Sequence, residues 1–246
     1  MNHNERVRIA KEICNKIVAK YKVYYIGVYG STARNEDTKY SDLEMVIASK
    51  NKDWWGTFRI KGMSVWLHFL PLEKVYAQAA WVEPEGTSST NNFLNSLTLY
   101  DKVNLKSEIR KRFRKISYKK FQKAALVPLG EVNDNISKMR NAIMKRGKKD
   151  ALILERFILL EQADAVIALL NRRHFTHGGI SHLSDIAKFK EVPKGYTKLS
   201  RTIWTTSSNR KVIAASSALS ASLTKFAEGH GVKIASYPST KEWKMV

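Results

Sequence analysis

The sequence predicts an α+β fold followed by a helical bundle. Its first half alternates short runs of β-branched and aromatic residues with polar turns, a pattern typical of strands. After about residue 118, apolar residues recur at helical spacing and no comparable strand pattern follows. The 246 residues, 43% hydrophobic and 26% charged, have globular composition and suffice for one or two domains. We therefore expect an α+β domain over residues 1–117 and a helical domain over residues 118–246.

The elements of the first domain follow from the spacing of its apolar residues. Residues 5–20 place apolar side chains at helical intervals with charges between them, which predicts a first helix. Residues 73–81 predict another helix, and a basic helical stretch runs to about Lys123. Strands are expected over residues 23–29, 42–48, 58–60, 63–70 and 94–100.

The second domain is expected to be helical throughout. The predicted helices cover residues 132–145, 150–171, 181–190 and 211–228. Residues 150–171 are so apolar that this helix should lie at the centre of the bundle.

The charge of the chain is unusual. Lys and Arg total 43 against 22 acids, which gives a net charge of +21. Such a field attracts nucleic acids, nucleotides or anionic membrane surfaces, although excess lysine can also serve solubility alone. Residues 106–123 hold nine of these cations against one acid, interleaved with aromatic residues. This stretch is either a track for contact with RNA or a helix whose aromatic side chains pack inward.

The only cysteine, Cys14, has no partner for an internal disulfide and is expected to be a packed thiol. The first residues lack the apolar run of a secretory signal, and no uncharged apolar run approaches the roughly 20 residues of a membrane span. We expect a cytoplasmic protein with no membrane association.

The segment from Gly30 to Glu44 carries the chemistry. Asp42 and Glu44 are separated by one residue at the start of a strand, so both carboxylates project from one face. Like charges this close call for a cation, and oxygen ligands suit Mg²⁺ bridging to phosphates. Gly30 and Ser31 end the preceding strand with a turn that can approach phosphate oxygens, and Arg34 can supply charge. The alternative is a strand end with two solvated acids and an ordinary surface arginine.

These residues carry a resemblance to a known family. A Gly-Ser turn, Arg34 and then Asp-x-Glu on the next strand resemble the DNA polymerase beta nucleotidyltransferase superfamily. The segments IGVYGSTAR and YSDLEM more closely resemble the kanamycin nucleotidyltransferase family, the aminoglycoside 4'-adenylyltransferases. The similarity continues in order through HFLPLEKVYAQA, LTLYD, KMRNAI and PKGYTKL, and is densest before residue 50.

The resemblance implies an N-terminal nucleotidyltransferase domain with a mixed sheet and helices, and an enzyme that transfers a nucleoside monophosphate to an acceptor hydroxyl. It further implies ATP as the donor, an aminoglycoside-like acceptor, and a homodimer whose sites lie between domains and are shared by both subunits. By match to the motif, Asp42 and Glu44 would be catalytic residues that hold Mg²⁺. Gly30, Ser31 and Arg34 would bind the triphosphate.

The family's general base is a glutamate four residues before a lysine that contacts phosphate. Aligning on KMRN puts Lys138 at this lysine and Asp134 at the catalytic base, with Glu131 as the alternative base. Without the resemblance, Asp134 and Lys138 form an ordinary i, i+4 ion pair on a helix.

Two departures from the family pattern bear on function. Trp66 stands where the family has a third acid, and it can either pack or stack on a base or sugar. Aminoglycosides are polycations, whereas a charge of +21 favours an anionic or neutral acceptor. The alternatives to the family activity are therefore a transferase acting on RNA or another anionic acceptor, and a non-catalytic nucleotide- or RNA-binding module.

Overall fold

The structure is a computed structural model that describes residues 1–82, 91–145, 149–176 and 182–234. The chain forms two compact units. One comprises Met1–Ser117 with His174–His177, and the other comprises Tyr118–Arg173 with Gly178–Val246. We call them the N-terminal unit and the helical unit.

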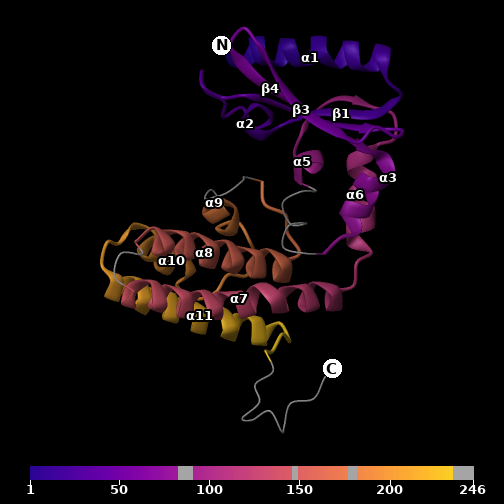
Figure 1. Cartoon of the computed structure of the whole chain (residues 1–246). Coiled ribbons are helices and arrows are strands. Elements are labelled where there is room, and N and C mark those ends of the chain that lie inside the picture. Colours follow the sequence, from indigo (N-terminus) through magenta and orange to yellow (C-terminus); the bar gives the residue numbers. More distant parts are fainter. Residues whose placement is uncertain (83–90, 146–148, 177–181, 235–246) are drawn as a thin grey trace. The chain divides into compact units, whose positions relative to one another are not determined.

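A five-stranded mixed sheet forms the centre of the N-terminal unit (Figure 1). The strands lie in the order β3-β4-β2-β1-β5, and only β2 and β4 run parallel to each other. Their bounds are β1 Val23–Tyr29, β2 Leu43–Ser49, β3 Trp54–Ile60, β4 Met63–Pro71 and β5 Leu97–Asp101. The two central strands, β1 and β2, are buried almost throughout, as their β-branched composition predicts.

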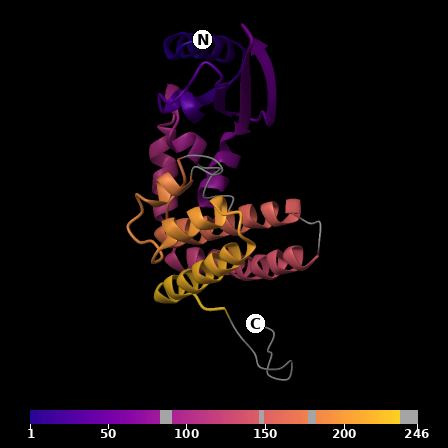
Figure 2. The ribbon, with the colours of Figure 1, turned by 90° about the vertical axis from the view of Figure 1, so that its left-hand side faces the viewer.

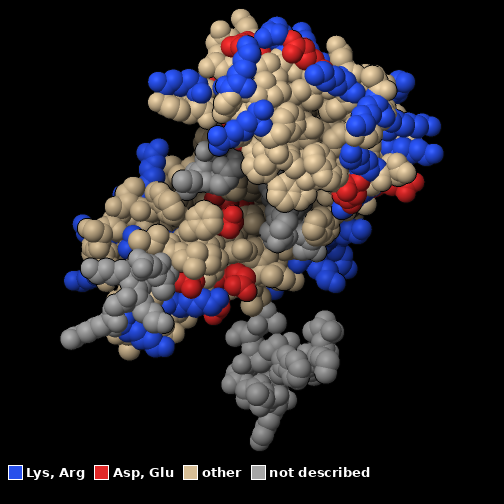
Figure 3. Space-filling model, turned by 45° about the horizontal axis from the view of Figure 1, so that its top comes forward, with Lys and Arg blue, Asp and Glu red and all other residues tan. Residues whose placement is uncertain are grey.

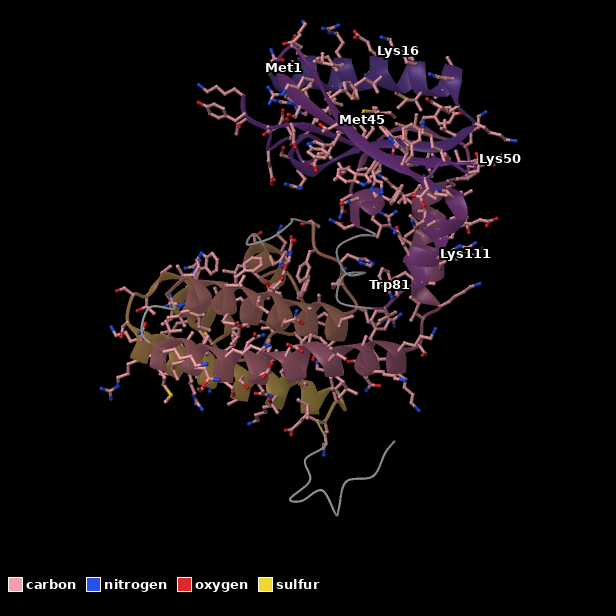
Figure 4. All side chains as sticks on the ribbon, in the orientation of Figure 1. Met1, Lys16, Met45, Lys50, Trp81 and Lys111 are labelled. Atoms are coloured by element: carbon pink, nitrogen blue, oxygen red, sulfur yellow. The ribbon has the colours of Figure 1, made fainter. Side chains whose placement is uncertain are left out.

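Helix α1 (His3–Lys20) covers one face of this sheet. Its apolar stripe packs on alternate residues of the strands, among them Met45, which Figure 4 shows between the sheet and the helix. Lys16 points away from the sheet on the opposite side of α1. Cys14 is buried in this core, as expected of a packed thiol.

The opposite face packs against α3 (Leu72–Ala80), α5 (Asn91–Leu94) and α6 (Leu105–Arg114). A short helix, α2 (Gly30–Ala33), follows β1 directly. Residues of β2 that alternate with the α1-facing positions, including Val46 and Ala48, belong to this second core. Because side chains alternate between the two faces, Glu44 lies on the same face as Val46 and Ala48, near the start of the strand.

The helical unit contains α7 (Tyr118–Met144), α8 (Lys149–Asn171), α9 (His182–Ile186), α10 (Tyr196–Thr205) and α11 (Asn209–Gly229). Helices α7, α8 and α11 lie side by side in both ribbon views (Figures 1 and 2). The second half of α8 is buried, as predicted for a central helix, whereas Ile153 and Leu154 near its start are exposed. The mixed sheet and the helical C-terminal region confirm the predicted fold class.

The structure corrects the expected elements between residues 105 and 145. The basic stretch is interrupted at residues 115–117, and α7 then runs without a break through Pro128, where the sequence predicted a new helix only from Val132. Proline removes one backbone hydrogen bond from a helix, but Pro128 is buried, and packing in the bundle offsets the cost. Helix α10 was not predicted at all.

A membrane span requires a long run of apolar residues, and none of the helices in the described part of the chain has one. Figure 3 shows Lys and Arg side chains distributed around the N-terminal unit on one face of the molecule.

Candidate active site

Asp42 and Glu44 lie at the entrance of β2, at one end of the sheet. Asp42 directly precedes the strand and Glu44 is its second residue. Glu44 is paired with Tyr29 on antiparallel β1 and with Trp66 on parallel β4. Paired residues of neighbouring strands project from the same face, so the Glu44 carboxylate lies between the side chains of these two aromatic residues.

The electrostatics of Glu44 show that the two acids are close. Burial raises the pKa of Glu44, and the negative charge of Asp42 raises it further. A hydrogen bond from Tyr29 and the positive charge of Arg34 act in the opposite direction. Among the described residues, neither Asp42 nor Glu44 forms an ion pair with lysine, arginine or histidine. The repulsion between the two carboxylates is therefore not offset by a direct cationic partner.

Tyr29 is a site residue that the sequence did not single out. Burial raises the pKa of its hydroxyl, and the charges of Glu44 and Asp42 add to the effect. The hydroxyl therefore stays protonated and donates a hydrogen bond to Glu44. In the sequence, Tyr29 is only the last residue of a predicted strand. The pairing of β1 with β2 brings it next to Glu44, and the sequence does not reveal which strands pair.

Gly30 leaves room for the Glu44 carboxylate, because glycine has no Cβ atom. Its φ is +70°, a conformation that favours glycine. A Cβ atom at this position would overlap with Oε2 of Glu44. The backbone of the turn thus approaches the acid so closely that any side chain at this position would displace the carboxylate, and the role of this turn in phosphate binding stays a prediction.

Ser31 and Arg34 belong to the same constellation. Ser31 is half-buried in α2, and Arg34 follows the helix directly. The Arg34 guanidinium donates to Glu36 Oε2 at 2.6 Å and to the carbonyl oxygen of Thr176 at 3.1 Å. The structure therefore brings together five of the predicted residues: Gly30, Ser31, Arg34, Asp42 and Glu44.

The loop that leads into Asp42 is anchored by a buried arginine. Arg6 of α1 is fully buried and forms an ion pair with Asp37. Its guanidinium also donates to the carbonyl oxygens of Thr38 and Ser41 at 2.9 and 3.0 Å. Arg6 thus fixes three residues of the segment just before Asp42. No local pattern in the sequence indicates this contact, because Arg6 resembles any other charged residue of an amphipathic helix.

A cavity of about 620 Å³ adjoins Asp42. Its wall includes Trp66, whose ring stacks on Trp55 with centroids 5.8 Å apart and planes 15° from parallel. Trp66 therefore packs against another aromatic residue and still lines the cavity. Lys39 and Lys61 also line it, and Lys61 is paired with Glu5 at 2.8 Å.

Asp134 and Lys138, the predicted base and its phosphate-binding lysine, lie on α7 in the helical unit. Lys138 Nζ lies 2.7 Å from Asp134 Oδ2 and 3.9 Å from Glu131 Oε2. The hydrogen bond with Asp134 raises the pKa of Lys138. The i, i+4 pair exists as expected from the spacing, and the catalytic role of Asp134 stays a prediction.

Asp42 and Glu44 fit a magnesium ion by their chemistry. They supply two carboxylates whose mutual repulsion a cation would relieve, and Mg²⁺ is usually held by one or two carboxylates together with substrate phosphates. The described residues contain no group of three or more acidic, histidine or cysteine side chains arranged for a metal. Trp66 is the β4 residue in register with Glu44, so an aromatic side chain stands at the position where a third acid would lie beside Glu44.

Comparisons with known proteins identify relatives of this chain. Residues 104–233 match the model of the kanamycin nucleotidyltransferase C-terminal domain. Two proteins named aminoglycoside nucleotidyltransferase (4'), from a Bacillus species and from Staphylococcus aureus, are each 27% identical over 205 residues. Each alignment covers 81% of this chain and 80% of the relative.

A solved structure supports the fold. The crystal structure of a nucleotidyltransferase-like protein from Exiguobacterium sibiricum superposes with a TM-score of 0.51 at 10% identity. The match covers 90% of this chain and 76% of that one. A nucleotidyltransferase requires a nucleoside triphosphate co-substrate. The chain is a nucleotidyltransferase that belongs to the kanamycin nucleotidyltransferase family.

Proposed function

We propose that this enzyme transfers AMP from ATP to a hydroxyl group of an aminoglycoside-like acceptor, with Mg²⁺ held by Asp42 and Glu44. The observation that carries the proposal is the close approach of the Gly30 turn to the Glu44 carboxylate beside Asp42. It supports the proposal because such a turn can bind phosphate oxygens and two carboxylates can hold Mg²⁺. The name of the 27% identical relatives supports the acceptor class.

Each residue has a role in this reaction. Gly30 and Ser31 would contact phosphate oxygens through the backbone and the hydroxyl group, and Arg34 would offset their negative charge. When bound, Mg²⁺ would neutralise charge on the triphosphate and on the departing pyrophosphate. Asp134 would accept the proton of the acceptor hydroxyl, whose oxygen forms the new bond to the α-phosphorus as the bond to pyrophosphate breaks. Lys138 would contact phosphate and Glu131 is the alternative base.

We also propose that the enzyme is a cytoplasmic homodimer with separate folding domains over residues 1–117 and 118–246. The family resemblance supports the dimer, and a single buried cysteine is consistent with a reducing compartment. Light scattering on the purified protein measures the oligomeric state, and a monomer at micromolar concentration would refute the dimer.

The function is tested by pyrophosphate release from each of the four ribonucleoside triphosphates with Mg²⁺. The acceptors are a panel of aminoglycosides and total RNA, and the control is Asp42→Ala. We expect release that depends on ATP and a kanamycin-like compound and is absent in the control. Release that needs no acceptor hydroxyl, or that survives in Asp42→Ala, would refute the proposed site.

The second candidate is a transferase for RNA or another anionic acceptor. Lys39 and Lys61 line the cavity beside Asp42, and cations dominate α6 and the first turn of α7. Of the aromatic residues in that basic stretch, Phe113 and Tyr118 are half-buried, and Phe121 is only 2% exposed and offers no ring face to a base. RNA-dependent pyrophosphate release would favour this candidate. RNA binding that is retained in Asp42→Ala without any release would favour a non-catalytic module.

A further inference from the structure

The helical unit contains a second cavity, of about 150 Å³, whose lining includes none of the residues proposed above for nucleotide transfer. Residues of α8, α9 and α10 line it. Its volume matches that of an engineered apolar cavity known to accommodate benzene, so one six-membered ring fits. All of its lining residues belong to the helical unit.

A buried acid forms the polar end of this cavity. Asp164 of α8 is 7% exposed and accepts a hydrogen bond from the Tyr196 hydroxyl of α10 through Oδ1. Its Oδ2 lies 3.2 Å from Nδ1 of His182, on α9. Three helices therefore converge on one carboxylate. Each carboxylate oxygen can accept more than one hydrogen bond, so Asp164 retains capacity for a ligand donor.

Ser200 supplies the observation that points to a ligand. It is 1% exposed, it lines the cavity, and within the described residues its Oγ has no hydrogen-bond partner. A buried hydroxyl without a partner costs free energy, and nearly all such groups in folded proteins are paired with protein atoms, water or a ligand. Because Ser200 and Asp164 line the same cavity, one ligand head group can satisfy both.

The charge and shape of the lining select the class of ligand. The cavity contains two acids, Asp164 and the exposed Glu161, and no lysine or arginine, in a chain with 43 of these cations. Its walls include the rings of Phe157 and Trp204, with centroids 6.4 Å apart, which suit the apolar body of a ligand. An ammonium group has three donors, and Asp164, Ser200 and Glu161 offer acceptors for them.

We propose that this cavity binds a small primary amine, with its ammonium group held by Asp164 and Ser200 and its apolar body against Phe157 and Trp204. None of its lining residues belongs to the Asp42 and Glu44 constellation, so it is a candidate place for an effector or a second ligand. The whole-molecule charge opposes cation binding, so any preference for an amine must come from the local lining.

Three probes of nearly identical shape test the proposal on the full-length protein: benzylamine, benzyl alcohol and benzoate. Binding is measured by calorimetry or by ligand-observed NMR at neutral pH. We expect benzylamine to bind about tenfold or more tightly than benzyl alcohol, the effect of one charge-assisted hydrogen bond, and benzoate to bind most weakly. Equal affinities, or a preference for benzoate, would overturn the proposal.

Substitutions locate the binding. Ser200→Ala removes a hydroxyl that has no partner in the free protein, so we expect unchanged folding stability and a loss of benzylamine affinity of about tenfold. Ser216→Ala is the matched control, because Ser216 is also a buried serine of the helical unit without a described partner but lies on α11, outside the cavity lining. Affinity that falls equally in both variants, or in neither, would refute the site.

The pH dependence gives an independent readout. Burial raises the pKa of Asp164 to about 6, opposed by the hydrogen bond and charge of His182, and Glu161 adds a further raising effect. Tyr196 faces the same carboxylate from α10. Asp164 is therefore ionised at neutral pH and protonated in mild acid, so benzylamine binding should weaken as pH falls through about 6. Benzyl alcohol binding should change much less, and an equal pH dependence of both probes would contradict the assignment.

Discussion

Gly30 and Gly62 both have positive φ, at +70° and +81°, but their surroundings differ. A Cβ atom at Gly62 would meet nothing within 4 Å, whereas at Gly30 it would overlap with the Glu44 carboxylate. Gly62→Ala should therefore cost only the backbone penalty of about 1–2 kcal/mol. Gly30→Ala should cost more and should displace Glu44, so that pyrophosphate release falls by about tenfold or more.

Urea unfolding and initial rates of both variants check this prediction. The comparison separates the conformational cost from the steric one because both positions share the same backbone region. If Gly30→Ala were as stable and as active as Gly62→Ala, the close approach of the turn to Glu44 would have no importance for the site.

The ionised Glu44 should lower the stability of the free enzyme. Its pKa is raised in the folded state, mainly by burial, so the folded protein binds a proton more readily than the unfolded chain does. The stabilisation from this proton is present in acid and is lost as pH rises through the folded-state pKa. Glu44→Gln should therefore stabilise the metal-free protein at neutral pH by about 1 kcal/mol while abolishing transfer.

Thermal unfolding in a chelator, from neutral to acidic pH, tests the sign. The stability difference between Glu44→Gln and the wild type should shrink as pH falls. Glu12→Gln is the control, because Glu12 is exposed and, among the residues that the structure describes, its ion pair is with Arg8 on the same helix, so we expect almost no effect at any pH. A gain in stability for Glu44→Gln that grew in acid would refute the assignment.

At the scale of elements, α1 does more than cover the sheet, because its Arg6 fixes the loop that precedes Asp42. The side chains of Arg6 and Asp37 are each 1% exposed. His3 Nδ1 also lies 2.7 Å from Asp37 Oδ1, so removing Arg6 leaves the buried carboxylate only partly compensated, which costs up to about 3–5 kcal/mol. Arg6→Met should therefore lower stability by this amount and should slow transfer through the displaced loop.

The double variant Arg6→Met with Asp37→Asn separates charge from position. It should recover part of the stability, because no unpaired carboxylate remains, but little of the activity, since the hydrogen bonds to the loop carbonyls are still missing. Chemical denaturation and steady-state kinetics measure the two effects. Full recovery of both would show that Arg6 only neutralises Asp37.

Strands β1, β2 and β4 and the first helix were predictable because their sequence signal is local, whereas the strand expected over residues 58–60 begins at Trp54 and the one expected from Leu94 begins at Leu97. Strand β1 begins and ends at Val23 and Tyr29, as its apolar run predicts. The spacing of Asp42 and Glu44 likewise predicted that both acids lie at the start of β2. Helix α10 escaped prediction because polar residues fill its exposed face and only Tyr196, Ser200 and Ile203 are buried. Pro128 indicated a helix boundary, because proline disfavours a helix interior. Helix α7 nevertheless continues through it, since Pro128 is buried in the bundle and packing offsets the cost.

The site was predictable only where it follows one stretch of chain. The residues from Gly30 to Glu44 are adjacent in sequence, and their spacing indicated their chemistry. Tyr29 and Arg6 reach the same site through strand pairing and a helix-to-loop contact, and no periodicity reports such contacts. The buried Asp164 was likewise invisible, because its partners His182 and Tyr196 come from two later helices.

At the scale of the whole molecule, the net charge of +21 distinguishes the two acceptor classes. An RNA acceptor would bind partly by displacing counterions from its phosphates, so its affinity should fall steeply with salt. Even three phosphate contacts should lower RNA-dependent kcat/KM by about tenfold or more between about 50 and 200 mM salt. A cationic aminoglycoside is repelled at long range, and salt screens this repulsion beyond about 10 Å.

We therefore expect kcat/KM with kanamycin to stay constant or to rise modestly over the same range of salt. Short-range contacts in a pocket are screened less than the long-range field, so the two effects of salt partly cancel for this acceptor. Initial rates of pyrophosphate release at several salt concentrations, with ATP saturating, give the slope directly. A slope as steep and negative as that expected for RNA would show that an anionic surface dominates acceptor binding, and it would argue against the aminoglycoside-like acceptor even if kanamycin were turned over.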